Sequence, residues 1–145
     1  MPTTQPTPEQ AQAFMARTTD TPVAMVNLLK FKEKATYAAD TPEAAENLTG
    51  QEAYARYGDA VAKLLADIGA KALFAGPAHG MLIGDGDWDM VAIVEYPNRA
   101  LMLSMGTSEA YQKIHYHRDA GLAHQLLIDT TSLPMSETWP AGTQS

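Results

Sequence analysis

The chain has 145 residues, of which 46% are hydrophobic and 19% charged, and this size and composition predict one globular domain. Its formal net charge of −7 argues against a protein that binds nucleic acid, because such proteins cluster Lys and Arg against phosphates. The absence of cysteine excludes disulfides, zinc–thiolate sites and thiol nucleophiles. No apolar run approaches the ~20 residues of a membrane span, and the first ten residues lack signal-peptide features, so we expect no membrane association and a cytoplasmic location.

Capping signals and apolar patterning predict the first half of the chain. A threonine N-cap followed by proline and glutamine predicts a short helix over residues 8–17. Residues 23–31 are apolar on both alternating faces, which is typical of a strand whose sheet is covered on both sides. The polar stretch 32–49 is expected to form an excursion with one helical turn. A capping box at residues 49–52 predicts a long helix that Gly69 ends.

A hairpin is predicted to follow that helix. Residues 72–75 and 80–83 are expected to be two halves of one bent strand, with a kink at Gly76-Pro77. The turn signal at residues 84–87 leads into a partner strand over residues 88–96.

Two helices and a strand complete the predicted elements. A short helix over residues 98–105 is capped by its asparagine, and a second helix, capped by Ser108 or Thr107, reaches about Gly121. Residues 125–129 are expected to form the last strand.

We therefore expect a single domain over residues 1–145, with its core at about 23–130 and a loose C-terminal tail over 134–145. The order β-α-β-β-α-β is the α+β arrangement of ferredoxin-like folds, in which one four-stranded antiparallel sheet carries helices on one face. Because the first strand is apolar on both sides, a second copy of the sheet is predicted to cover the other face, which makes a homodimer. A cavity between sheet and helices is the expected ligand site.

Three short motifs resemble a known family. They are Gly86-Asp87-Trp88, then Glu95-Tyr96-Pro97, then residues 108–112 with Arg118 ten positions after the serine. In order and spacing they are similar to the domain-of-unknown-function family 1330, over about residues 23–130. The resemblance implies the dimeric α/β-barrel superfamily of ferredoxin-like folds. That group includes cofactor-independent monooxygenases, isomerases and haem-binding enzymes, and it implies no single activity.

Arg118 is the leading candidate for binding a substrate. It follows Tyr111 by seven residues and Ile114 by four, so the three share one helical face, and Ile114 indicates that this face points inward. A guanidinium there could hold the carboxylate of a small substrate in a bidentate pair. The alternatives are an internal ion pair with Glu95 or Asp129 and a helix-end contact on the surface.

Histidines supply the candidate catalytic groups. His79 follows the predicted kink and could point into a cavity as a general base, although it could equally be a solvated loop residue. His115 and His117 diverge by about 200° on a helix, so they are not expected to share a metal, and His117 is placed beside the inward stripe. No metal site and no cofactor are predicted; only the family resemblance admits a single histidine as an axial ligand of haem.

Further candidate substrate contacts lie on other elements. Asn27 interrupts an apolar strand, so it either contacts a ligand or joins a buried polar network. Tyr54 and Tyr57 lie on the apolar face of the long helix and could place their hydroxyls in a cavity, or could serve core and dimer packing. Ser108 and Tyr111, from the last family motif, complete the set.

Two functional hypotheses follow. One is a small-molecule-binding protein, or a cofactor-independent enzyme, that acts on a small anionic organic substrate. The other is a non-catalytic dimeric module whose buried polar groups fix the dimer register. The sequence leaves open whether any substrate is turned over.

Overall fold

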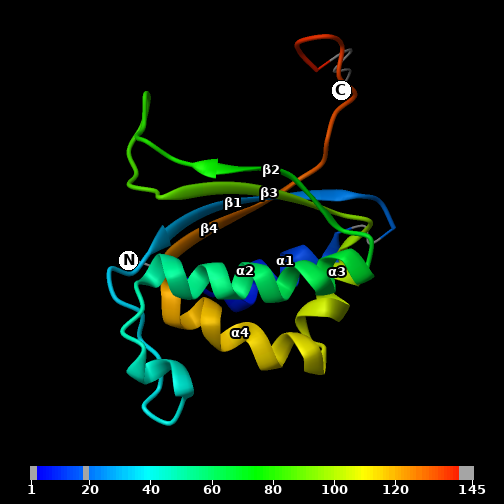
Figure 1. Cartoon of the computed structure of the whole chain (residues 1–145). Helices are drawn as coiled ribbons and strands as arrows, with labels where there is room; N and C mark the ends of the chain where they lie inside the picture. The colour runs from blue at the N-terminus through cyan, green and yellow to red at the C-terminus, as the bar shows by residue number, and fades with distance from the viewer. Residues whose placement is uncertain (1–2, 18–19, 141–145) are drawn as a thin grey trace.

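The computed structural model describes residues 3–17 and 20–140, in which a four-stranded antiparallel sheet carries α-helices on one face (Figure 1). The helices are α1 (Pro8–Ala16), α2 (Gly50–Asp67), α3 (Arg99–Gly106) and α4 (Glu109–Gly121), with a short 3-10 helix η1 (Pro42–Ala45) in the excursion. The strands are β1 (Val23–Phe31), β2 (Lys71–Pro77), β3 (Met90–Tyr96) and β4 (Leu122–Thr130).

The strand order is β2-β3-β1-β4, and every neighbouring pair is antiparallel. With α2 between β1 and β2 and α4 between β3 and β4, this is the ferredoxin-like β-α-β-β-α-β arrangement. The predicted α+β fold is confirmed.

Capping boxes start the helices where the sequence predicts them. Thr49 accepts a hydrogen bond from the backbone N–H of Glu52, whose side chain accepts in return from the backbone of Thr49. Thr7 and Gln10 form the same pair at the start of α1. Gly69 follows α2 with a φ of 78°, a left-handed conformation that costs glycine little.

The predicted bent strand is wrong in its second half. β2 ends at Pro77, and residues 80–83 belong to an irregular loop that projects from the sheet. The last backbone hydrogen bond beside β3 runs from the N–H of Ala78 to the oxygen of Asp89, at 2.9 Å, and beyond it Gly84 and Gly86 adopt positive φ angles that belong to turns and not to a strand. Leu82 is 97% exposed at the tip of this projecting loop, which we define as residues 78–89.

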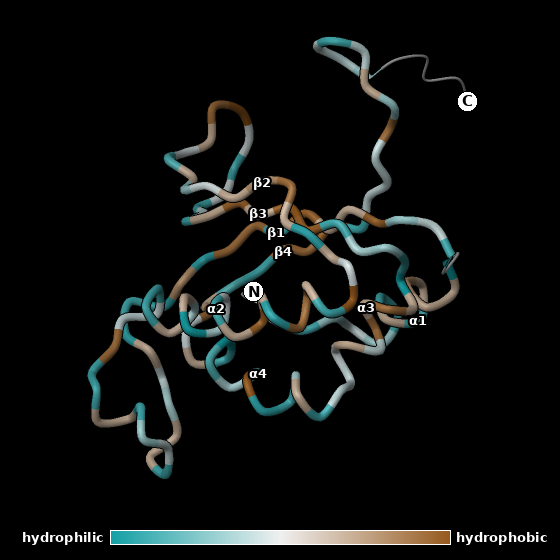
Figure 2. The backbone as a smooth tube through the Cα atoms, turned by 45° about the vertical axis from the view of Figure 1, so that its right-hand side comes forward, coloured by the Kyte–Doolittle hydropathy of each residue, from teal (hydrophilic) through white to brown (hydrophobic). Residues whose placement is uncertain are grey.

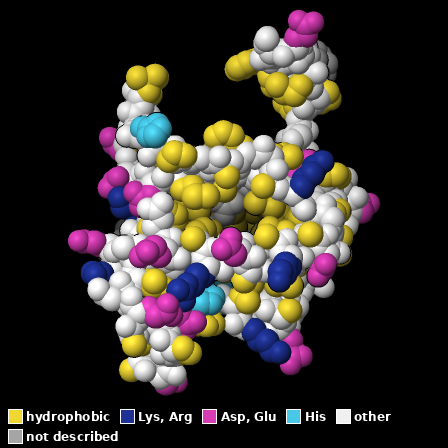
Figure 3. Space-filling model, in the orientation of Figure 1, with side chains coloured by type: hydrophobic (Ala, Val, Ile, Leu, Met, Phe, Trp, Pro, Cys, Tyr) yellow, Lys and Arg dark blue, Asp and Glu magenta, His cyan; other side chains and the backbone are white. Residues whose placement is uncertain are grey.

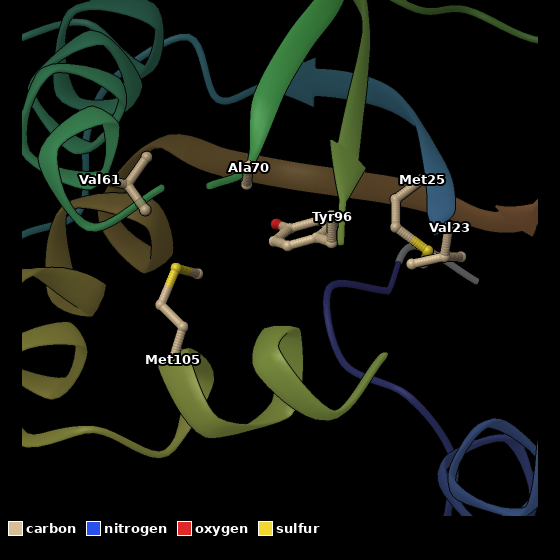
Figure 4. Packing of buried hydrophobic residues seen from close by; sticks show 6 residues of the cluster. All are labelled: Val23, Met25, Val61, Ala70, Tyr96 and Met105. Atoms are coloured by element: carbon tan, nitrogen blue, oxygen red, sulfur yellow. The ribbon is translucent and has the colours of Figure 1, made fainter. Parts of the chain in front are cut away.

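The core lies between the sheet and the helices, where Figure 4 shows side chains from strands and helices converging. β1 contributes from its inward face, and α2 and α3 contribute from opposite sides. The fully or largely buried members are Val23, Met25, Val61, Ala70, Tyr96 and Met105. Because Val23 and Met25 point toward the helices, the alternate residues of β1 point to the opposite, helix-free face.

That helix-free face is apolar. The strand registers align two rows across it, Ile128–Val26–Ile93–Phe74 and Leu126–Leu28–Val91–Gly76. Figure 2 shows the hydrophobic character of the strands, and in Figures 1 and 3 the projecting loop and residues 131–140, which follow β4, stand above the sheet on either side. Phe74, Leu126 and Ile128 keep 55%, 41% and 46% of their surface exposed. We call this surface the open face.

Candidate functional site

A cavity of about 210 Å³ lies between the inward face of the sheet and helices α2, α3 and α4. Its polar lining comes from elements that are distant in sequence, and residues 4–6 of the N-terminal segment complete its wall. The polar side chains are Asn27, Tyr57, Tyr111, His115, Arg118 and Gln125, together with the rings of Tyr54 and Tyr96. Asn27, Tyr54, Tyr57, Tyr111 and Arg118, all of them candidates from the sequence, thus line one cavity.

A chain of hydrogen bonds links α4 to the centre of the sheet. Arg118 donates to Oε1 of Gln125 at 2.6 Å, and Nε2 of Gln125 donates to Oδ1 of Asn27 at 2.8 Å. Asn27 then donates to the backbone oxygen of Ala92 on β3 at 3.2 Å. Each amide is thereby satisfied on both its oxygen and its nitrogen, which fixes the orientation of the guanidinium.

The Arg118 side chain is only 12% exposed, yet neutral groups are its main partners. Besides Gln125, it donates to the backbone oxygen of Thr4 at 2.7 Å. Its acidic contact is Asp119, 3.4 Å away and half exposed. Within the described residues, no Asp or Glu lines the cavity. The positive charge of Arg118 is therefore weakly neutralised where it faces the cavity.

The alternative ion pairs for Arg118 are wrong, because both acidic residues have other partners. Asp129 receives two hydrogen bonds from Arg99, at 2.8 and 3.1 Å, and one from Arg17 at 2.8 Å. The hydrogen bond from Arg99 holds the pKa of Asp129 below its usual value. Glu95 lies 3.7 Å from Lys71.

Two tyrosines from opposite helices meet in the cavity. The hydroxyls of Tyr57 on α2 and Tyr111 on α4 are 2.8 Å apart. Burial raises the pKa of Tyr57 above its usual value and raises the pKa of Tyr54 to about 12. The phenols of Tyr54 and Tyr57 are therefore neutral hydrogen-bond donors near pH 7.

The structure places His115 in the cavity and His117 outside it, the reverse of the sequence expectation. The inward face of α4 carries residues 111, 115 and 118, and Nδ1 of His115 lies 3.0 Å from the carboxylate of Asp119. His117 packs against the excursion, with Nδ1 2.6 Å from the hydroxyl of Tyr37, and burial lowers its pKa. His117 is thus not placed to transfer a proton to a ligand in the cavity.

The other two candidates lie outside the cavity lining. His79 is an exposed residue of the projecting loop. Ser108 accepts a hydrogen bond from the backbone N–H of Tyr111 and donates to the backbone oxygen of Met105, so it caps α4.

The family model of a domain of unknown function, DUF1330, matches residues 44–130, which is more than half of the chain. The chain belongs to the DUF1330 family. The match starts later than the expected residue 23, so it includes Tyr54, Arg118 and Gln125 but neither Asn27 nor the N-terminal segment.

Solved structures agree with this family and fold. A crystal structure of a protein of unknown function from Rhodopseudomonas palustris is 33% identical, with a TM-score of 0.79, over 90% of this chain and 97% of that one. The methylated form of the R. palustris protein gives 32% identity and a TM-score of 0.80, over 90% and 94% of the two chains. An Arabidopsis thaliana protein, 19% identical with a TM-score of 0.51 over 79% and 98%, shares the fold alone. No curated protein matches significantly.

Sequence reasoning missed two polar side chains, on α4 and β4, that line the cavity of this DUF1330 protein. Gln125 interrupts an otherwise apolar β4 at an inward position, and this pattern is the same signal that singled out Asn27. His115 follows Tyr111 by one helical turn, so the Tyr111–Arg118 stripe already contained it.

The site does not fit haem. The cavity of about 210 Å³ is smaller than the roughly 300–1,000 Å³ of pockets for drug-sized ligands. His115, the histidine in its lining, is held by Asp119 and lies 3.5 Å from Arg118.

Among the described residues, no helix has both the length and the apolar character to cross a membrane.

Proposed function

We propose that this protein binds a small organic anion in the cavity and holds its anionic group with Arg118. The observation that carries the proposal is a largely buried guanidinium, aimed into a cavity whose described lining contains no carboxylate, in a chain with net charge −7. Buried arginines normally pair with acids, as Arg99 does with Asp129. An incoming carboxylate would take the place of the Thr4 carbonyl and supply the missing negative charge.

The cavity also holds groups that can move or share a proton, so the proposal extends to turnover of the bound anion without a cofactor. His115 and the Tyr57–Tyr111 pair lie in the same lining as Arg118. We assign the binding of the anion to Arg118. We propose no particular reaction, because the reaction depends on the chemistry of the bound anion.

Isothermal titration calorimetry tests the binding step with benzoate and its neutral isostere benzamide. We expect benzoate to bind more tightly than benzamide, and Arg118→Met to weaken benzoate about tenfold or more, because a charge-assisted hydrogen bond is lost. Arg56→Met is the matched control. Arg56 pairs with Glu46 outside the cavity, so this variant removes the same charge from the chain and should keep benzoate affinity. Equal losses in both variants would contradict the proposal.

The alternative of a purely structural network makes a different prediction. If the chain from Arg118 to Asn27 only holds the fold, Arg118→Met should lower the unfolding midpoint and no anion should bind. Urea unfolding of the same variant therefore separates the two functions.

We also propose that the protein is a homodimer that stacks open face on open face. The observation favouring this is two aligned apolar rows that no described element covers, flanked by the projecting loop and residues 131–140. Ile128 lies in one row and Met15 is an exposed methionine of α1, on the helix side. By sedimentation velocity we expect a dimer that Ile128→Glu dissociates and Met15→Glu does not. A monomeric wild type at micromolar concentration would overturn this assembly.

A further inference from the structure

The cavity has a second hydrogen-bonding end, opposite Arg118 along α4. Tyr111 and Arg118 are seven residues apart on the same helical face, so the rise of the helix separates their Cα atoms by about 10 Å. Both side chains line the cavity. A ligand anchored at Arg118 therefore reaches toward the phenol of Tyr111 if its body follows the helix.

The Tyr57–Tyr111 pair has one proton left to donate. Each phenol has one O–H, and in their mutual 2.8 Å hydrogen bond one phenol donates and the other accepts. Among the described residues, neither hydroxyl makes another hydrogen bond. Whichever phenol donates within the pair, the other keeps a free O–H, and a largely buried donor gains from an acceptor supplied by a ligand.

The wall around these two ends suits a flat apolar body. It is built mainly from methionines and aromatic rings, which are Met25, Met102, Met105, Tyr54 and Tyr96. Methionine side chains adapt to the edges of a ring, and tyrosine rings pack against its face or edge. The volume of about 210 Å³ equals the space of about seven water molecules, so the body is a single small ring.

The second group of the ligand is neutral. No carboxylate of the described chain lines the cavity, so a ligand ammonium would be buried without a partner. We infer that the ligand is a single-ring aromatic carboxylate with a hydroxyl or carbonyl oxygen across the ring, where the Tyr57–Tyr111 pair donates to it. This inference rests on the proposed function, because the carboxylate must first bind Arg118.

Four probes test it by calorimetry on the full chain: benzoate, 4-hydroxybenzoate, 2-hydroxybenzoate and 4-(aminomethyl)benzoate. We expect 4-hydroxybenzoate to bind about fivefold more tightly than benzoate, which is the effect of one additional hydrogen bond. The 2-hydroxy isomer places its hydroxyl beside the carboxylate, far from the phenols, and should show no such gain. A 4-(aminomethyl)benzoate probe should bind more weakly than benzoate.

The decisive variant is Tyr57→Phe combined with Tyr111→Phe, which removes both hydroxyls and keeps both rings. We expect it to bind 4-hydroxybenzoate no better than benzoate, so that the ratio of the two affinities falls from about five to about one. Tyr54→Phe is the matched control, because it removes another phenol from the cavity but leaves the pair intact, and it should keep the fivefold preference.

The outcomes distinguish the hydrogen bond from the Tyr57–Tyr111 pair, which is the inference, from the anion site at Arg118, which is the proposed function. If benzoate binds through Arg118 but the 4-hydroxy group gives no gain, or if the double variant keeps the gain, the inference is overturned and the anion site stands. Loss of the gain in Tyr54→Phe alone would also overturn it, because the donor would then be a different phenol. If none of the probes binds the wild type, the proposed function fails and the inference with it.

Discussion

Arg118 and Gln125 are joined by a 2.6 Å hydrogen bond that ties the last turn of α4 to the inward face of β4. Because β4 follows α4 directly, seven residues suffice to turn the chain back and bring the amide to the guanidinium. The amide satisfies one donor of Arg118 without neutralising its charge. A mostly buried cation whose close partners are an amide and a carbonyl is therefore held ready for an anion, whereas a carboxylate at the same distance inside the cavity would have neutralised it.

Arg99→Met should be strongly destabilising. Arg99 is 7% exposed, and its loss leaves the largely buried Asp129 with the exposed Arg17 as its remaining ion-pair partner among the described residues. Removing one member of a buried ion pair costs about 3 kcal/mol, whereas Arg17→Met, at the surface end of the same group, should cost below about 1 kcal/mol. Urea unfolding of both variants measures the loss in the free energy of unfolding. Equal losses would contradict the prediction, because Arg17 and Arg99 would then contribute equally to stability through Asp129.

Gly121→Ala should disrupt the crossing of α2 and α4. A Cβ at Gly121 would lie 2.9 Å from the backbone nitrogen of Tyr54 and would also meet the backbone oxygen of Gly50, and neither backbone atom can move alone. Overpacking of this kind costs about 1–3 kcal/mol or more. At Gly58, in the middle of α2, a Cβ meets nothing within 4 Å, so Gly58→Ala should stabilise by about 0.5–1 kcal/mol. Thermal unfolding would refute this if both variants shifted Tm in the same direction.

Thr49→Ala should cost about 1 kcal/mol, because the N-cap hydrogen bond to Glu52 is lost from a helix that packs on the core. Thr7→Ala removes the same capping box from α1, which has no buried residue, and should change global stability less. Unfolding midpoints in urea compare the two losses. A larger loss for Thr7→Ala would mean that α1 contributes more to the cooperative unit than its burial indicates.

Stability should fall as the pH is lowered below about 6.5, in part because of His117. Burial lowers the pKa of His117 from its ordinary value of 6.5, an effect that Glu43 opposes and Arg56 reinforces. The unfolded chain therefore binds the proton first, and each step of acidification below pH 6.5 favours it until the folded-state pKa is passed. Tyr37 and Tyr116, the other groups against this ring, stay neutral throughout this range.

Urea unfolding at pH 7, 6 and 5 measures this dependence. His117→Gln should reduce the loss of stability between pH 7 and 5, and His79→Gln, in the exposed projecting loop, should leave it unchanged. An unaltered pH dependence in His117→Gln would contradict the role given to this residue.

Local signals predicted the elements that frame the site. The capping boxes at Thr7 and Thr49 set the starts of α1 and α2, and the two-sided apolar pattern set β1, because these features depend on residues a few positions apart. The inward face of α4 was predicted in the same way, from the spacing of Tyr111 and Arg118.

The projecting loop was not predictable from the same kind of signal. Residues 80–83 are apolar and read as a strand, but their exposure shows that they find no partner in the sheet. Periodicity reports that a segment is apolar and does not report what covers it.

The part of the cavity wall that the N-terminal segment forms could not be predicted from the sequence either. The hydrogen bond from Arg118 to the Thr4 carbonyl joins residues 114 positions apart and uses a backbone oxygen that every residue carries. Nothing in the side-chain pattern marks such a contact. The exchange of roles between His115 and His117 is a different case, because the one-turn spacing of His115 from Tyr111 already places it on the inward face of α4.

The most direct test of the account is a crystal structure of the protein grown with benzoate at a concentration that saturates binding in solution. The account predicts the carboxylate within hydrogen-bond distance of Arg118, in place of the Thr4 carbonyl, with the ring in the cavity lined by Tyr57 and Tyr111. Benzoate bound elsewhere, with Thr4 still accepting from Arg118, would contradict it.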